Sequence, residues 1–312
     1  MIADGDDFLK DSTQVFPIRL AQRVAVAAIL QYIFLRRHGT LAGNRDTLLT
    51  TRTAEGPRAE GFSQTGLRFL PEVLIVGLGY LIYSQVRGLA ADRTTDALTT
   101  ALWIVDLERN LGLFEELALQ KMVLGSSWLI EPFNIVYFYG LFPMIIPTAL
   151  WLFVQHRPTY VLLRNAFLIS GGIAVFFYLL TPTMPPRLLP GFGFVDTALG
   201  HPLVPTYSSI PGVNHYAALP SMHVGWNFLV TLGLVGTLGR KWLRFTVLAV
   251  PLTMFFSTVV TGNHYFFDGF AGLMVASAGI LVALTIERRF SSGPHKSLPR
   301  LRRSPRPQPT QA

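Results

Sequence analysis

The chain has 312 residues, of which 50% are apolar or aromatic and only 14% are Asp, Glu, Lys or Arg. Soluble domains carry about 25% charged residues, so this composition excludes an ordinary soluble protein. The net charge of +8 does not indicate nucleic-acid binding, because the basic residues lie in tails and short loops beside apolar tracts. The lack of cysteine excludes disulfides, thiol nucleophiles and cysteine metal ligands.

Residues 1–67 are polar and basic and predict a cytoplasmic N-terminal region. Their one apolar patch, Leu20–Leu35, is short for a membrane span and is flanked by arginines, which favours an interfacial helix on anionic lipid. Residues 39–66 lack periodicity and predict a linker. The acidic first eleven residues do not have the basic start of a secretory signal, so no cleaved signal is expected.

Residues 68–286 contain six apolar tracts, each close to the roughly 20 residues that cross a bilayer as a helix. The tracts are 69–86, 131–154, 160–180, 222–238, 243–261 and 265–286. We therefore expect an all-α integral membrane bundle of six transmembrane helices, which forms the catalytic domain. Between the first two tracts, residues 87–130 alternate apolar and charged positions at helical spacing, which predicts one or two amphipathic helices at the membrane surface.

Residues 287–312 are rich in Pro, Arg and Ser and predict a disordered cytoplasmic tail. The basic residues also predict which side each loop faces. With both termini in the cytoplasm, 21 of the 26 Lys and Arg residues lie inside, as the positive-inside rule requires. The loops 181–221 and 262–264 then lie together on the outer side of a multi-pass protein of the cell membrane.

Three polar clusters fall on this predicted outer side. They read TPTMPPRLLPGFGF, AALPSMHVGW and VVTGNHYFFDGFAG. Their candidate functional residues are Arg187 in the first, Ser221 and His223 in the second, and Asn263, His264 and Asp268 in the third.

These residue types are suited to transfer of a phosphate group. His264 and Asp268 are four residues apart, so on a helix the carboxylate can orient the imidazole and raise the basicity of its other nitrogen. His223 can protonate a departing alkoxide. Ser221 stands at a helix start, where amides bind phosphate, and Arg187 can add a charged, planar donor.

Other uses of the same residues remain open. Asp268 can simply favour the positive end of a helix dipole, and Ser221 can be a plain N-cap. His223, His264 and Asp268 are also a set that can hold zinc with one open position, which would indicate a metal-dependent hydrolase. A non-catalytic lipid-binding or transport protein has no need of a His–Asp pair at this spacing. We expect an enzyme without metal or cofactor that acts on a membrane lipid.

The motifs PSMH and GNHYFFD resemble signatures of the type 2 phosphatidic acid phosphatase superfamily, over about residues 100–286 and including the stretch ERNLGLFEELALQ. The resemblance implies six transmembrane helices and a phosphohistidine intermediate. It implies that His264 is the nucleophile and Asp268 its orienting acid. It further implies that His223 is the acid on the leaving group, while Ser221 binds phosphate beside Asn263.

The sequence departs from the phosphatase pattern at two of its basic positions. The pattern has Ser-Arg with the arginine six residues before the nucleophile, whereas this chain has Ser257 and Thr258. Leu180 stands in place of the lysine of the first motif, and Leu188 follows Arg187 in place of proline. The form TPTMPPR…LPSMH…GNHYFFD is more similar to the inositol phosphorylceramide synthase branch, which implies transfer of a phosphoalcohol such as phosphoinositol between lipids. A lipid phosphate phosphatase is the alternative.

Overall fold

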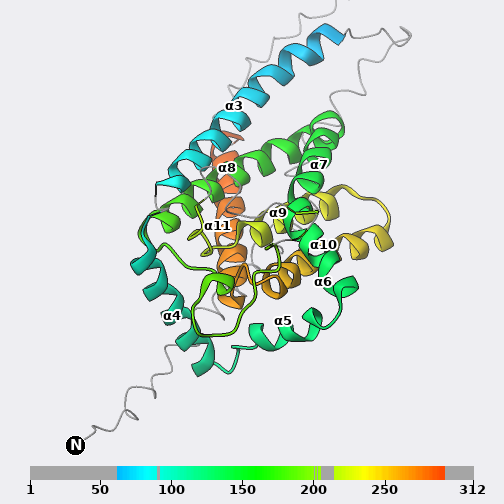
Figure 1. The fold of residues 1–312 in the computed structure, drawn as a ribbon. Coiled ribbons are helices and arrows are strands. Elements are labelled where there is room, and N and C mark those ends of the chain that lie inside the picture. Colours follow the sequence, from blue (N-terminus) through cyan, green and yellow to red (C-terminus); the bar gives the residue numbers. More distant parts are fainter. Residues whose placement is uncertain (1–61, 90–91, 200, 202, 205–213, 292–312) are drawn as a thin grey trace, which may run out of the picture.

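The computed structural model describes residues 62–89, 92–199, 201, 203–204 and 214–291. Those residues form nine α-helices and no strand, apart from one isolated bridge between Thr183 and Ala217. The all-α prediction is therefore confirmed for the described part of the chain (Figure 1). The predicted interfacial helix at Leu20–Leu35, residues 39–61 of the predicted linker and residues 292–312 of the predicted tail lie outside the described residues. The remaining residues of the linker, 62–66, and of the tail, 287–291, are instead helical, as the start of α3 and the end of α11.

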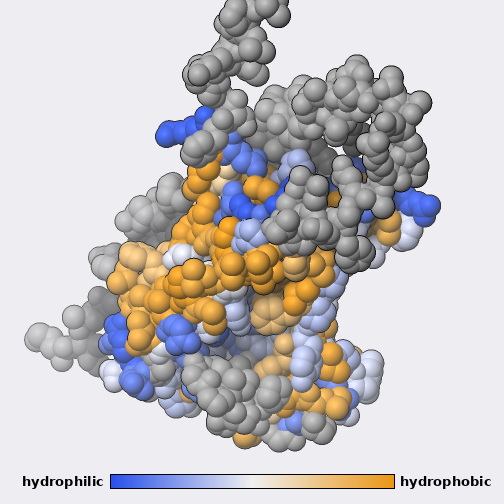
Figure 2. All heavy atoms as spheres, turned by 90° about the horizontal axis from the view of Figure 1, so that it is seen from above, coloured by the Kyte–Doolittle hydropathy of each residue, from blue (hydrophilic) through white to orange (hydrophobic). Residues whose placement is uncertain are grey.

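Four of the predicted apolar tracts form helices that are long and apolar enough to cross a membrane. They are α3 (Phe62–Gly88), α8 (Arg157–Leu180), α10 (Lys241–Val260) and α11 (Phe266–Ser291). Many large apolar side chains of α3, α8 and α10 are exposed, which suits helices that face lipid. Figure 2 shows apolar side chains covering much of one face of the molecule.

The predicted tract 131–154 is not one straight helix. It forms α6 (Ser127–Tyr139) and α7 (Leu141–Gln155), which are bent by 48° at the break between them. A proline ring clashes with the carbonyl group four residues earlier, so Pro143 prevents Tyr139 from continuing one regular helix. Gly140 fills the break, where an added Cβ would overlap the carbonyl oxygen of Val136. The pair is a fifth span if its two halves cross together.

The predicted tract 222–238 forms α9 (Met222–Thr237), which lies in the middle of the bundle. This helix has 16 residues, a length of about 24 Å that falls short of the roughly 30 Å hydrocarbon layer. It packs against α7, α8, α10 and α11, and twelve of its side chains are buried. The described helices thus account for four or five spans by length and composition, and the predicted six are not confirmed.

Two amphipathic helices form between α3 and α6, where the spacing predicts one or two. They are α4 (Thr94–Asn110) and α5 (Glu116–Leu124). The buried face of α4, with Ala101 and Ile104, packs against Met184, Leu219 and Tyr265 from the loops around α9 and α11. Figure 1 shows α4 and α5 at the end of the bundle opposite the start of α3. The loops that carry the predicted site residues are therefore covered by these two helices.

Candidate active site

The starts of α9 and α11 are in direct backbone contact. A Cβ atom added at Gly272 would overlap the carbonyl oxygen of Ser221, and one added at Gly225 would lie 2.6 Å from the carbonyl oxygen of Gly272. The Ser221 amide also donates a hydrogen bond to the carbonyl oxygen of Asp268, at 2.9 Å. Glycine is required at this crossing because any side chain would push the helices apart. The two helix starts that carry the predicted residues are thus held side by side.

A cavity of about 180 Å³ lies beside this crossing. Four of the six predicted site residues line it: Arg187, His223, Asn263 and His264. The other lining residues come from α3, α6, α7, α8, α9 and the adjacent loops, and many are aromatic or polar: Tyr80, Tyr83, Arg87, Tyr137, Leu141, Phe142, Tyr178, Pro185, Asn214, His215, Ala217, Ala218, Met222 and Trp226. Residues far apart in sequence therefore meet at one partly enclosed site.

The two histidines face the same cavity from different helices. Their ring centroids are 6.1 Å apart. The ring of Tyr137, on α6, stacks on His223 with centroids 4.5 Å apart and an interplanar angle of 27°. Tyr137 also contacts His264 edge to face, with centroids 6.3 Å apart. It therefore fixes the orientation of the His223 ring, and no motif in the sequence indicated this role.

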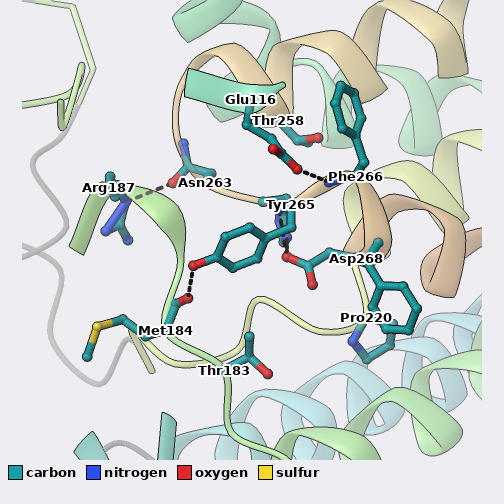
Figure 3. Close-up of polar contacts among 12 residues, drawn as sticks. Glu116, Thr183, Met184, Arg187, Pro220, Thr258, Asn263, Tyr265, Phe266 and Asp268 are labelled. Carbon is teal, nitrogen blue, oxygen red and sulfur yellow. Dashed lines mark hydrogen bonds and ion pairs between the residues drawn. The ribbon is translucent and has the colours of Figure 1, made fainter. Parts of the chain in front are cut away.

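Asp268 lies beside His264 but has a second partner. The distance from His264 Nδ1 to Asp268 Oδ2 is 3.4 Å, and Nδ1 has no hydrogen-bond partner among the described residues. Asp268 Oδ2 instead accepts a hydrogen bond from the Tyr265 amide at 2.9 Å, as an acidic side chain does in the first turn of a helix (Figure 3). The Asp268 carboxylate can therefore orient His264 and also accepts the backbone amide that precedes α11.

His264 is buried just before α11, with 4% of its surface exposed. Burial lowers the pKa of His264 to about 3; the positive charges of Arg87 and Arg187 act in the same direction, and a hydrogen bond to the Ala218 backbone acts against them. The imidazole is therefore neutral at physiological pH. A neutral imidazole has the free lone pair that a nucleophile needs.

Arg187 is held rigidly at the cavity wall. Its amide donates to the Gly262 carbonyl oxygen at 2.8 Å, and its Nε donates to Asn263 Oδ1 at 2.9 Å (Figure 3). Asn263 Nδ2 in turn donates to Thr261 Oγ1 at 2.8 Å. Gly262 has φ of +70°, a conformation that side chains other than glycine rarely adopt. The TGN sequence before His264 therefore places one guanidinium group beside the histidines.

Ser221 and Thr258 do not line the cavity. Ser221 is the N-cap of α9, is fully buried, and its Oγ has no hydrogen-bond partner within the described part of the chain. Thr258, at the position of the arginine in the phosphatase pattern, is also fully buried. Its carbonyl oxygen accepts the amides of Asn263 and His264, both at 3.0 Å. These two positions shape the backbone around the site and bring no charge to it.

Two buried glutamates support α11 from outside the cavity, and sequence reasoning assigned them no role. Glu108 Oε1 accepts the Phe267 amide at 2.7 Å. Glu116 Oε1 accepts the Phe266 amide at 3.0 Å, as Figure 3 shows. Burial, a hydrogen bond to Glu116 and its charge raise the pKa of Glu108 to about 11. The Glu108 carboxyl group is therefore protonated at neutral pH. With Asp268, three carboxyl groups accept three consecutive amides at the start of α11.

Sequence reasoning also missed the cavity wall formed by α3. Arg87 reaches the cavity from a helix more than one hundred residues before His223. No local pattern around Arg87 distinguishes it from the other basic residues that flank the apolar tracts. For the metal alternative, no group of three His, Asp or Glu side chains suited to hold an ion occurs among the residues that the structure describes.

The apolar helices and the buried, cationic cavity define a multi-pass membrane protein with a polar site inside a helical bundle. A family model described as the PAP2 superfamily matches residues 102–282. The chain belongs to this superfamily, whose members are typically phosphatases or phosphotransferases. The match includes both histidines, Arg187, Glu108 and Glu116. No curated protein and no solved structure matches the chain significantly.

Proposed function

We propose that the protein is a membrane-integral phosphotransferase that moves a phosphoalcohol head group, such as phosphoinositol, from one lipid to another through a phosphohistidine. The observation that carries the proposal is the pair of histidines on one cavity, next to the Arg187–Asn263 pair. Membership of the PAP2 superfamily supports the reaction class. The departures from the phosphatase pattern at Leu180 and Thr258 favour an alcohol over water as the acceptor.

In the proposed reaction His264 attacks phosphorus. The P–O bond to the donor alcohol breaks, and His223 gives the leaving oxygen its proton. In the second half, His223 takes the proton of the acceptor hydroxyl, whose oxygen attacks phosphorus and displaces His264. Both histidines are then as they began. Arg187 and Asn263 bind the phosphate oxygens and stabilise the charge that develops on them.

A change in the hydrogen bonding of His264 prepares the attack. In the structure Nδ1 has no partner among the described residues, while the ring interacts with the Ala218 backbone. For the attack, the proton resides on Nδ1 and is donated to Asp268, whose Oδ2 is 3.4 Å away. Nε2 then has its lone pair available. Asp268 is therefore a positioning residue that acts through His264.

The reaction is tested with purified full-length protein in lipid nanodiscs. Phosphatidylinositol labelled in its phosphate is supplied with a lipid alcohol, and the reaction is stopped during turnover. We expect an acid-labile, base-stable label on His264, absent in His264→Ala, and a labelled product lipid. His223→Ala loses activity with lipid donors and regains part of it with a p-nitrophenyl phosphodiester, whose leaving group needs no proton.

Three results oppose the proposal. Label on His223 in the wild-type protein contradicts the assignment of the two histidines. Release of a water-soluble phosphate product, with no labelled lipid, identifies a phosphatase instead. If no lipid tested gives a labelled histidine or a labelled product, the protein is not this enzyme and the lipid-binding or transport alternative is favoured.

We also propose that six helices cross the membrane, with both termini in the cytoplasm and the cavity open to the outer side. The distribution of basic residues supports this orientation. Because the chain has no cysteine, single cysteines at Leu199 and Ser297 are clean reporters. An impermeant thiol reagent on intact cells is expected to label Leu199→Cys and not Ser297→Cys. The reverse pattern refutes the orientation.

A further inference from the structure

The described lining of the cavity is cationic. Its positive charge comes from two guanidinium groups, Arg87 and Arg187, which lie beside the imidazoles of His215, His223 and His264, and the described lining includes no Asp or Glu. A partly enclosed site with this charge favours an anion. The family model matches residues 102–282, and among the described lining residues in that range Arg187 is the only lysine or arginine. The second guanidinium group therefore comes from outside the region that matches the family.

Arg87 stands in the last turn of α3 and is partly buried. Its carbonyl oxygen accepts a hydrogen bond from Asn214 Nδ2 at 2.7 Å, which ties the end of α3 to the loop before α9. Its guanidinium carbon lies 5.8 Å from the centroid of the Tyr178 ring. The Tyr178 hydroxyl donates to the Pro220 carbonyl oxygen at 2.9 Å, directly before the segment that carries His223. Arg87 is thus fixed relative to the histidines.

The charge of Arg87 reaches the centre of the site. It interacts electrostatically with His215, His223 and His264. Arg187 acts on His264 from the side of Asn263. A phosphate bound between the histidines therefore has one guanidinium group contributed by α3 and another by the loop before α9.

We propose that Arg87 is a second phosphate-binding residue of the cavity and that it acts with Arg187 on the non-reacting oxygens of the lipid phosphate. This inference rests on the proposed function, since it assigns the anion at the same site. It gives α3 a direct part in substrate binding, beyond crossing the membrane. Two guanidinium groups on one phosphate also stabilise the additional negative charge of the transition state.

The test measures binding separately from catalysis. All variants are made in the His264→Ala background of the full-length protein in nanodiscs, so that no covalent intermediate forms. Binding of radiolabelled inorganic phosphate is measured by equilibrium dialysis. Loss of one charge-assisted contact is expected to weaken binding about tenfold or more, so Arg87→Gln raises the Kd by that factor. Arg87→Lys retains the positive charge but lacks the planar guanidinium group. Its Kd for phosphate is expected to lie between that of the His264→Ala parent and that of Arg87→Gln.

Arg109→Gln is the matched control. Arg109 also lies over aromatic rings, 5.1 Å from the Phe114 centroid and 5.2 Å from that of Phe192, but it does not line the cavity. Its removal is expected to leave the Kd for phosphate unchanged. Thermal unfolding of each variant separates a general loss of structure from a loss of binding, and Arg87→Lys keeps the test valid if Arg87→Gln unfolds.

The outcomes distinguish this inference from the proposed function. A Kd in Arg87→Gln equal to that of the His264→Ala parent, or equal weakening in Arg109→Gln, overturns the role of Arg87 while phosphate binding itself persists. Absence of phosphate binding in the parent protein and in every variant overturns the proposed function, and the inference with it. A raised Kd confined to the Arg87 variants supports both.

Discussion

Replacing Glu108 with alanine is expected to destabilise the protein far more than replacing it with glutamine. Glu108 Oε1 accepts the Phe267 amide at 2.7 Å, and the second carboxyl oxygens of Glu108 and Glu116 are both buried without a hydrogen-bond partner among the described residues. Burial and the neighbouring Glu116 raise the pKa of Glu108, so the Glu108 carboxyl group is protonated at neutral pH and has a hydroxyl that can donate to Glu116. Each residue of the pair therefore depends on the other.

The two substitutions differ in what they leave unpaired. Alanine leaves the Phe267 amide without its acceptor and the Glu116 carboxyl group without its partner, at about 1–3 kcal/mol for each group. The expected loss in the free energy of unfolding is about 2–6 kcal/mol. Glutamine retains an acceptor for the amide and an NH₂ donor for Glu116, so its expected cost is about 1 kcal/mol or less. Unfolding titrations with SDS in mixed micelles measure both values.

The same pair predicts a dependence of stability on pH. Burial, the hydrogen bond to Glu116 and its charge raise the pKa of Glu108 from 4.5 to about 11. Because the folded-state pKa is above the unfolded one, the stabilisation is fully present below about pH 4.5 and is lost as the pH rises through about 11. Between pH 7 and pH 10, wild type should lose more stability than Glu108→Gln. Equal losses for alanine and glutamine, or identical alkaline profiles, would falsify the protonated state of Glu108.

Asp268→Asn keeps an acceptor for the Tyr265 amide, so folding is expected to persist while turnover falls, by analogy with hydrolase triads up to about 10⁴-fold. Near-normal turnover in this variant would leave Asp268 with its capping role alone. Gly272→Ala places a methyl group against the Ser221 carbonyl oxygen and is expected to cost about 1–3 kcal/mol and most of the activity. The control, Gly172→Ala, adds its methyl group where nothing lies within 4 Å, and it should be neutral or slightly stabilising. Comparable losses in the two glycine variants, measured by SDS unfolding and by turnover, would refute the close-contact explanation.

Apolar tracts predicted the long helices well because length and hydropathy alone decide them. The observed α8 and α10 begin and end within a few residues of the predicted tracts. The bend at Gly140 was missed because hydropathy does not register the local clash of Pro143 with the preceding turn. The tract of α9 was predicted as a span because its composition is as apolar as that of a lipid-facing helix. Its 16 residues are too few for a candidate span by length, so its crossing of the membrane stays a prediction.

At the site, spacing predicted that His264 and Asp268 would be neighbours, and their side chains are 3.4 Å apart. The distribution of basic residues predicted that the loops of Arg187 and His223 lie on the same side of the membrane, and both residues line one cavity. The sequence did not predict that Arg87 and Tyr137 line the cavity, because they reach its wall only through the packing of α3 and α6. Spacing also did not show that the Asp268 carboxylate is shared with a backbone amide.

The glycine crossing between α9 and α11 has a consequence for how the surface of this protein can vary. Backbone contact at Gly225 and Gly272, and not the fit of large side chains, sets how close the two helices come. Substitutions among the exposed apolar residues of α3, α8 and α10 therefore leave the spacing of the two histidines unchanged. The exterior can be adapted to a thicker, thinner or more fluid bilayer while the chemistry in the interior stays the same.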